Sequence, residues 1–203
     1  MYLPKQFNHP EHAARIMREH PLASLVTTDD TGFPFMAHLP LKLIEEGGQP
    51  VKLLGHCARG NPLGSHLQQR PSALASFMGP QAYMSPKVYA DLQRVPTWSY
   101  LAVQARVQVR MLEGAQAKDA LLKQLIADHE PAYAAQWRAL PADYTDRMLN
   151  AITAFEMNIT ELQCSVKLNQ HRPEAHAAMY TAYAQGNAQE QALAGWMKTL
   201  GMV

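Results

Sequence analysis

The chain has 203 residues, a formal net charge of +1 and 17% charged residues, below the roughly 25% of ordinary soluble domains. A hydrophobic content of 47% suffices for a real core and argues against disorder. The balanced charge excludes a general attraction to nucleic acid or anionic membranes. No stretch approaches the roughly 18 apolar residues of a membrane helix, and the start, MYLPKQFNHPEH, has no apolar signal core.

Cysteine usage favours a reducing compartment. Cys57 and Cys164 are far apart and form no C-x-x-C pair, so neither a disulfide framework nor a cysteine zinc site is predicted. The expected location is therefore the cytoplasm, with no membrane association.

The first quarter of the chain predicts a helix and then short strands. Residues 8–20 form the helix, with Asn8 and Glu11 at capping-box spacing and Pro10 in the first turn. Extended segments are predicted at 22–28, 33–44, 51–57 and 72–78. The prolines in 33–44 indicate an edge strand or a bulge.

A short helix is expected from the Asn61-Pro62 pair, since Asn caps helices well and Pro suits the first helical position. Residues 79–97 contain three prolines and predict a long loop with one helical turn. The clearest strand is 98–111, where apolar residues alternate with polar and aromatic ones. Its second face is suited to a partner subunit.

The second half predicts mostly helices. Residues 115–130 and 141–153 form helices, residues 154–168 form another strand, and the alanine-rich end forms two helices broken at Gly186-Asn187. Short strands joined by tight turns, with helices inserted and appended, indicate a small β-barrel with helices packed outside.

The segment LLGHCARGNPLGSHL suggests an anion site. Arg59 precedes the predicted helix start, where free backbone N–H groups favour an anion, and its guanidinium matches phosphate geometry. A surface arginine in a solvated turn is the equally simple alternative. The aromatic residues near the proline-rich loop suit a flat heterocycle, although some of them are expected to fill core: Phe77, Tyr83, Tyr89, Trp98 and Tyr100. Together these features suggest a phosphorylated planar cofactor.

Other catalytic patterns are missing from the sequence. The histidines His38, His56 and His66 lie near the Arg59 segment, but no H-x-x-x-H or H-E-x-x-H spacing occurs, so no metal site is predicted. No G-x-S-x-G, G-x-G-x-x-G or Walker pattern occurs either.

Several motifs in order carry a family resemblance. They are MYLPKQF, AHLPL, GHCARGNP, GPQAYMSPKVY, VPTWSY, FEMNIT and KLNQHRP, spread from residue 1 to about residue 172. The chain resembles the PaiB-like family of FMN-binding negative transcriptional regulators. It departs from the family pattern at Cys57 and Gly60 and at Asn169 and His171.

The resemblance implies a split β-barrel similar to pyridoxamine-phosphate oxidase, a homodimer, and FMN as the cofactor. It implies an FMN-binding split-barrel domain over 1–172 and a C-terminal helical extension over 173–203. Arg59 carries over as the phosphate ligand, with Lys167 or a backbone amide as the second donor. The cofactor-binding residues expected from the motifs are His38, His56, Arg59, Asn61, Tyr83, Ser85, Trp98, Tyr100, Lys167 and Gln170.

The resemblance also implies repression of transcription, yet no helix-turn-helix and no basic stripe is evident, so DNA is a partner by resemblance only. A flavin-dependent oxidoreductase of unknown substrate and a haem-handling split barrel remain as alternatives. No reaction and no catalytic residue is assigned.

Overall fold

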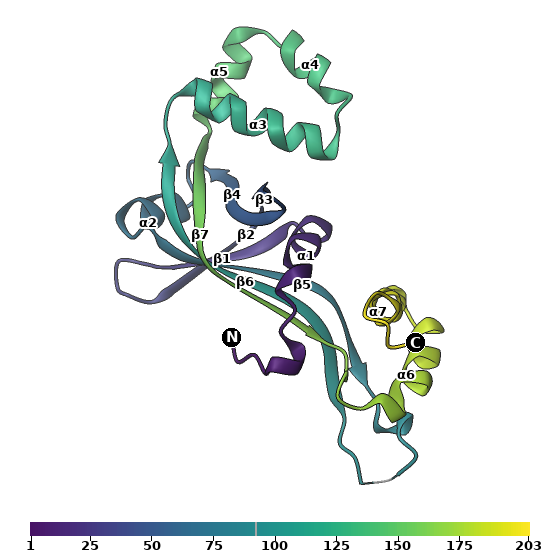
Figure 1. The fold of residues 1–203 in the computed structure, drawn as a ribbon. Coiled ribbons are helices and arrows are strands. Elements are labelled where there is room, and N and C mark those ends of the chain that lie inside the picture. The colour runs from purple at the N-terminus through teal and green to yellow at the C-terminus, as the bar shows by residue number, and fades with distance from the viewer. Residues whose placement is uncertain (92) are drawn as a thin grey trace. The chain divides into compact units, whose positions relative to one another are not determined.

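The computed structural model describes residues 1–91 and 93–203. A seven-stranded sheet runs in the order β2-β1-β5-β6-β7-β4-β3, and the pairs β1–β2, β1–β5, β3–β4 and β4–β7 are antiparallel (Figure 1). The strands are β1 (Leu22–Thr28), β2 (Pro34–Pro40), β3 (Lys42–Glu46), β4 (Gln49–Ala58), β5 (Ser72–Met84), β6 (Thr97–Leu112) and β7 (Ile152–Lys167).

Helices and 3-10 turns connect and follow these strands. The α-helices are α1 (Ala13–Glu19), α2 (Leu63–Gln69), α3 (Ala115–His129), α4 (Tyr133–Ala139), α5 (Ala142–Asn150), α6 (His176–Ala184) and α7 (Ala188–Thr199). The 3-10 turns are η1 (Lys5–Phe7), η2 (Pro10–His12), η3 (Pro86–Val88) and η4 (Pro173–Ala175). Among the described residues no helix is both long and apolar enough to cross a bilayer.

The chain divides into two compact units. Unit 1 comprises Met1–His20, Phe77–Gln104 and Leu162–Val203, and unit 2 comprises Pro21–Ser76 and Ala105–Glu161. The strands β5, β6 and β7 contribute residues to both units.

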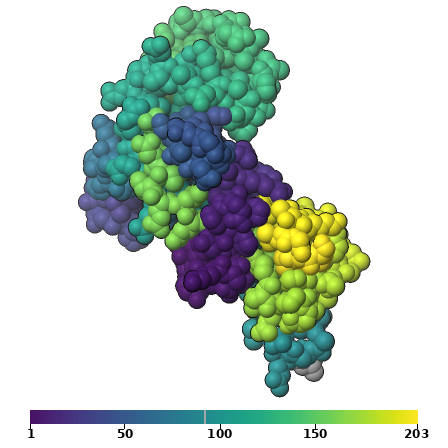
Figure 2. Space-filling view, viewed as in Figure 1, coloured from purple at the N-terminus to yellow at the C-terminus, as the bar shows by residue number. Residues whose placement is uncertain are grey.

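Unit 1 packs the two chain ends together. Figure 2 shows the N-terminal segment in purple against the C-terminal helices in yellow, where the ring centroids of His12 and Trp196 lie 5.2 Å apart. Trp196 is buried on α7, and Tyr183 of α6 is buried and donates to Ser99 Oγ at 2.8 Å. The first contact joins α7 to the N-terminal segment, and the second joins α6 to the strand β6.

Unit 2 contains an apolar core between strands and inserted helices. Leu54, Leu121 and Ala154 form a buried cluster, so α3 covers β4 and β7 there. A charged cluster lies on β4, β6 and β7: Glu156 accepts from Lys52 Nζ at 3.1 Å and from Arg110 Nε at 2.8 Å.

Several sequence predictions are confirmed. β1 has the predicted bounds, and β2 is an edge strand with its prolines at its two ends. Along β6, Leu101 to Val109 are buried at alternate positions while Arg106, Gln108 and Arg110 are exposed. The helix break at Gly186-Asn187 also occurs, and Asn187 caps α7.

The predicted loop over 79–97 is wrong at its start. β5 continues to Met84, and the irregular segment begins only at Ser85. The prediction rested on three prolines, of which Pro80 lies within β5, but β1 pairs with β5 only over Leu74–Ser76. Pro80 therefore lies beyond that pairing, and a strand with a free edge tolerates its missing N–H.

Two local details also differ from the predictions. Asn8 does not cap a helix: it bridges to Ser165, and η2 has no side-chain cap. Glu11 instead bonds His9. The helix α4 was not predicted, because its sequence YAAQWRA carries no clear apolar stripe and lies between prolines.

Candidate functional site

Unit 1 contains a pocket of about 390 Å³. Its walls come from three segments far apart in the chain: the N-terminus, the stretch from the end of β5 to the start of β6, and the end of β7 with the turn after it. The lining residues are Gln6, Phe7, Met84, Tyr89, Gln93, Arg94, Val95, Thr97, Trp98, Ser99, Lys167, Asn169, His171 and Arg172.

A strained turn shapes one wall of this pocket. Asn169 follows β7 and is the one non-glycine residue with positive φ among the described residues, at 64°. Asn tolerates this left-handed conformation better than most residues. Its side chain contacts the Tyr89 hydroxyl, with Nδ2 donating at 3.0 Å, and its carbonyl lies 3.1 Å from His176 Nε2. The turn thus ties the end of β7 to the proline-rich loop.

Cationic side chains gather in the lining. Lys167 Nζ donates to Thr97 Oγ1 at 2.8 Å, and burial lowers the pKa of Lys167. The Arg94 guanidinium lies 5.2 Å from the centre of the Tyr89 ring and pairs with Asp91 at 2.9 Å. Arg94 Nε is buried and has no hydrogen-bond partner in the described part of the chain. A buried donor without a partner is costly, so Arg94 Nε is available to an acceptor from a ligand.

Aromatic surface adjoins these cations. Trp98 lines the pocket and is 52% exposed, and its ring meets the exposed Tyr83 ring edge to face at 6.5 Å. Phe7 lies edge to face with His171 at 5.7 Å. Large exposed aromatic side chains next to a cationic pocket are suited to a ligand that is flat at one end and anionic at the other.

These residues fit FMN by their chemistry. The cofactor combines a flat ring with a phosphate dianion, and the pocket offers both an apolar aromatic wall and unpaired donor capacity on Lys167 and Arg94. Its volume lies within the roughly 300–1,000 Å³ of ordinary ligand sites.

Arg59 lies in unit 2, in an exposed turn. Its backbone N–H donates to Ala151 O at 2.8 Å, and its Nη1 donates to Asn150 O at 3.4 Å. Arg59 also lines a hollow of about 310 Å³ with Lys118, whose Nζ already donates to the carbonyls of Leu149 and Ile152. The guanidinium therefore keeps most of its donor capacity.

The helix after Arg59 has fewer free backbone N–H groups at its start than predicted. α2 has only seven residues, and Asn61 itself bonds its first amides: Leu63 N donates to Asn61 Oδ1 and Gly64 N to Asn61 O. The expectation of free helix-start amides beside Arg59 is wrong for these two groups. A role for Arg59 towards phosphate thus rests on its guanidinium.

The two predicted histidines in unit 2 differ in environment. His38 is exposed and its Nδ1 lies 3.1 Å from Ser24 Oγ. His56 is half-buried, burial lowers its pKa, and its Nδ1 has no hydrogen-bond partner among the described residues. His56 is therefore a neutral imidazole with one free nitrogen.

The predicted site residues divide between the units. Unit 2 holds His38, His56, Arg59 and Asn61, and unit 1 holds Tyr83, Ser85, Trp98, Tyr100, Lys167 and Gln170. Of these, Trp98 and Lys167 line the pocket, and the Tyr100 ring centre is 5.6 Å from Lys167 Nζ.

Two of the predicted unit 1 residues make hydrogen bonds within their own turns. Ser85 caps η3 by accepting from Lys87 N at 3.2 Å. Gln170 closes the turn after β7, where its Oε1 accepts from Leu168 N and its Nε2 donates to Val166 O. Sequence reasoning missed Arg94, although it stands in the proline-rich loop next to the VPTWSY motif.

Solved structures define the class of this fold. The flavocytochrome Anf3 from Azotobacter vinelandii matches with a TM-score of 0.64 at 14% identity, over 83% of this chain and 73% of that one. The FAD and heme binding protein from Mycobacterium smegmatis matches with a TM-score of 0.60 at 18% identity, over 78% and 71%. The predicted fold class, a split β-barrel with peripheral helices, is confirmed.

Sequence comparison gives the family within that class. The chain belongs to the family described as "Putative FMN-binding domain", which matches residues 1–161. It is 31% identical to the "Protease synthase and sporulation protein PAI 2" of Bacillus subtilis (strain 168) over 181 residues, which is 86% of this chain and 84% of the relative. The resemblance to the PaiB-like family is confirmed, and with it FMN as the family's cofactor.

Proposed function

We propose that this protein binds FMN in the unit 1 pocket and functions as a homodimer. One observation carries the assignment of the pocket. The motifs MYLPKQF, GPQAYMSPKVY, VPTWSY and KLNQHRP are spread over most of the chain, and all four contribute lining residues to the same pocket. If these motifs only formed turns of the fold, they would not need to line the same cavity.

Each part of the pocket has a task in this proposal. Lys167 and Arg94 hold the phosphate through charge-assisted hydrogen bonds, and Thr97 keeps the Lys167 amine in place. Trp98 provides a flat surface for the ring and keeps water from one face of it. Bound FMN supplies redox chemistry, while the chain binds and orients it.

Exposed apolar side chains in unit 1 support a homodimer. Met78 and Tyr83 on β5 and Trp98 on β6 are each about half exposed, and Val95 is 79% exposed. Such exposed apolar groups suit an interface, and symmetric dimers are the commonest soluble assembly.

Regulation of gene expression is the second candidate function. It is favoured by the Bacillus subtilis relative, whose name refers to protease synthesis and sporulation. Direct DNA binding has less support, since the net charge is only +1. A DNA mobility shift at several salt concentrations, with and without FMN, tests it, because a phosphate-binding surface must lose affinity as salt rises.

Location in the cytoplasm belongs to the same proposal. Cys57 and Cys164 are both buried and unpaired in the described chain, which suits a reducing compartment.

A titration with two ligands tests the pocket. FMN and riboflavin differ only in the phosphate, so a phosphate donor affects one of them and not the other. Lys167→Ala should weaken FMN binding by at least about tenfold and leave riboflavin binding unchanged, because one hydrogen bond to a charged group is worth roughly 1.5–3 kcal/mol. Lys87→Ala is the matched control, since Lys87 is exposed on η3 outside the pocket. Equal FMN affinity in wild type and Lys167→Ala would place the phosphate elsewhere.

A further inference from the structure

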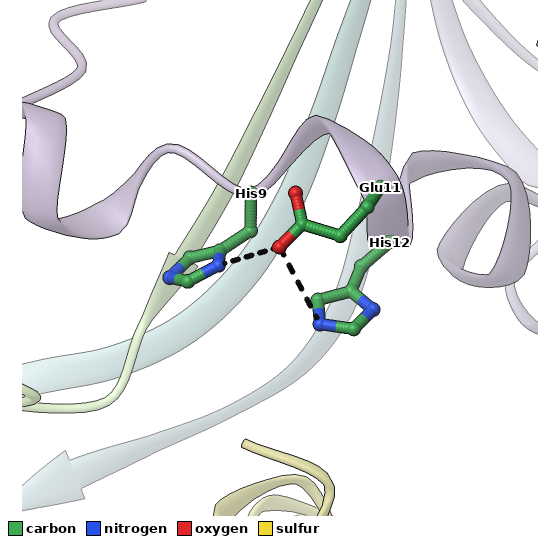
Figure 3. A group of neighbouring side chains, drawn as sticks. All are labelled: His9, Glu11 and His12. Carbon is green, nitrogen blue, oxygen red and sulfur yellow. Dashed lines mark hydrogen bonds and ion pairs between the residues drawn. The ribbon is translucent and has the colours of Figure 1, made fainter.

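Three side chains on the N-terminal segment of unit 1 converge outside the pocket. His9, Glu11 and His12 each offer one metal-ligating atom, and these atoms all lie within 4.8 Å of one another. Figure 3 shows both imidazoles turned towards the same carboxylate oxygen of Glu11. None of the three lines the 390 Å³ pocket.

The local backbone explains this convergence. His9 precedes the 3-10 turn η2, Pro10 occupies its first position, and His12 ends it. A 3-10 helix has three residues per turn, so side chains three residues apart lie on the same side. His9 and His12 therefore stack, with ring centroids 5.9 Å apart and planes at 29°, and Glu11 reaches between them.

The distances are close to those of a coordination shell. His9 Nδ1 is 3.0 Å from Glu11 Oε1, and His12 Nε2 is 3.9 Å from the same atom. Ligands about 2.0–2.1 Å from a tetrahedral ion lie about 3.4 Å from one another. The two separations from Glu11 Oε1, 3.0 and 3.9 Å, lie on either side of that spacing.

We propose that His9, Glu11 and His12 form a binding site for one divalent first-row transition metal ion, with water completing its coordination. Two imidazoles and one carboxylate are a donor set for Zn²⁺, Co²⁺ or Ni²⁺ rather than for Mg²⁺ or Ca²⁺, which prefer oxygen ligands. The Glu11 side chain is 59% exposed, so an ion and its water ligands reach the site from solvent.

The surroundings hold two of the ligands in place. The His12 ring packs edge to face on the buried Trp196, and Arg15 covers the same indole at 4.2 Å. The backbone of His9 donates to Cys164 O at 3.0 Å, which ties the segment to β7.

Metal binding requires one rearrangement of protons. His9 Nε2 lies 3.4 Å from Gln170 Nε2, and Gln170 Oε1 accepts from Leu168 N, so His9 accepts there and carries its proton on Nδ1. Binding through Nδ1 releases that proton or moves it to Nε2, where it needs an acceptor. A hydrogen-bond acceptor for the second ring nitrogen of a metal-binding histidine changes metal affinity by about 10–100-fold.

Calorimetric titration of the full chain, without a histidine tag and after treatment with a chelator, tests the site. Zn²⁺ should bind at one equivalent per chain, and Mg²⁺ should not bind. Glu11→Gln and His9→Ala should each weaken Zn²⁺ binding by at least about tenfold, whereas His129→Ala, which removes an exposed histidine of α3, should not.

Two further measurements keep the result decisive. Circular dichroism of Glu11→Gln checks that the exposed substitution leaves the fold intact. Absorption of the Co²⁺ complex reports the coordination directly. Absence of Zn²⁺ binding below about 100 µM, or an equal loss of affinity in His129→Ala, would overturn the proposal. The readout does not involve FMN, so it stands apart from the proposed function.

Discussion

Glu156 lies between two cations in unit 2, and its charge state links stability to pH. Its side chain is 13% exposed and pairs with Lys52 and Arg110. Burial alone raises the pKa of this carboxyl, but the hydrogen bonds from Arg110 and Lys52 outweigh burial and lower it below 4.5. The ionised form is therefore stabilised in the folded state.

We expect Glu156→Gln to lose roughly 1.5–3 kcal/mol of unfolding free energy at pH 7. The folded pKa is below the unfolded one, so this contribution is fully present above pH 4.5 and disappears as pH falls through the folded pKa. Urea unfolding of wild type and Glu156→Gln at pH 7 and at pH 2 measures this difference in unfolding free energy. Asp143→Asn, which breaks the exposed pair with Arg147, is the control and should change stability little. A Glu156→Gln deficit that persists at pH 2 would contradict the account.

Arg59 is the residue on which sequence and structure differ most in detail. Arg59 is the alternative phosphate ligand to Lys167 and Arg94 of the unit 1 pocket. If Arg59 holds the phosphate instead, replacing it with Ala should weaken FMN binding by about one to three orders of magnitude, because a hydrogen bond from the guanidinium to a charged group is worth roughly 1.5–3 kcal/mol. Arg59→Lys should recover only part of that loss, since lysine keeps the charge without the planar fork.

Riboflavin again serves as the comparison ligand for Arg59. It lacks the phosphate, so wild type and Arg59→Ala should bind it equally. Fluorescence titration of both ligands into both proteins separates a phosphate ligand from a solvated surface arginine. The surface alternative predicts no change with FMN either, and that result would remove Arg59 from the site.

At the scale of single elements, α7 begins with a complete capping box. Asn187 Oδ1 accepts from Gln189 N at 2.9 Å, and Glu190 Oε2 accepts from Asn187 N at 2.7 Å. Asn187→Ala should lower the unfolding free energy by about 1 kcal/mol, or roughly 2–4 °C in melting temperature. Thermal unfolding measures the shift.

Gly195, in the same helix, provides a control whose substitution should raise the unfolding free energy instead of lowering it. It is exposed, and a Cβ there meets nothing within 4 Å. Gly195→Ala should stabilise the protein by about 0.5–1 kcal/mol through helix propensity. If Asn187→Ala proves neutral while Gly195→Ala stabilises, α7 does not depend on its cap.

Elements with a strong local pattern were predictable from the sequence, and elements governed by their neighbours were not. The sequence of β6 alternates, and its burial alternates from Val103 to Arg110, so its span and its buried face followed from periodicity. The end of β5 contains Pro80, which locally indicates a loop. Whether a proline fits a strand depends on which edge is paired, and the sequence does not contain that information.

At the scale of the whole molecule, the candidate site was also only partly predictable, because the sequence does not show long-range packing. Each motif was visible in the sequence, and Trp98 and Lys167 were identified from them. That four motifs line one pocket depends on long-range packing, such as the contact between Tyr89 and Asn169. Arg94 was missed because its significance lies in a buried Nε, which only the folded chain reveals.

The assembly is the next prediction at this scale. We expect a two-fold homodimer that buries Tyr83 and Trp98, and light scattering at micromolar concentration should report twice the mass of a 203-residue chain. Trp98→Ala should weaken the dimer, while Tyr144→Ala, an exposed aromatic of α5 in unit 2, should not. A wild-type protein that remains monomeric would contradict the prediction.

The absorption spectrum of the purified protein, mixed with FMN and then freed of unbound ligand by gel filtration, tests the central claim most directly. If the chain binds FMN, the protein fraction shows the visible bands of an oxidised flavin, with one FMN per chain. A protein fraction without flavin bands, or one that carries the Soret band of haem in their place, would contradict it.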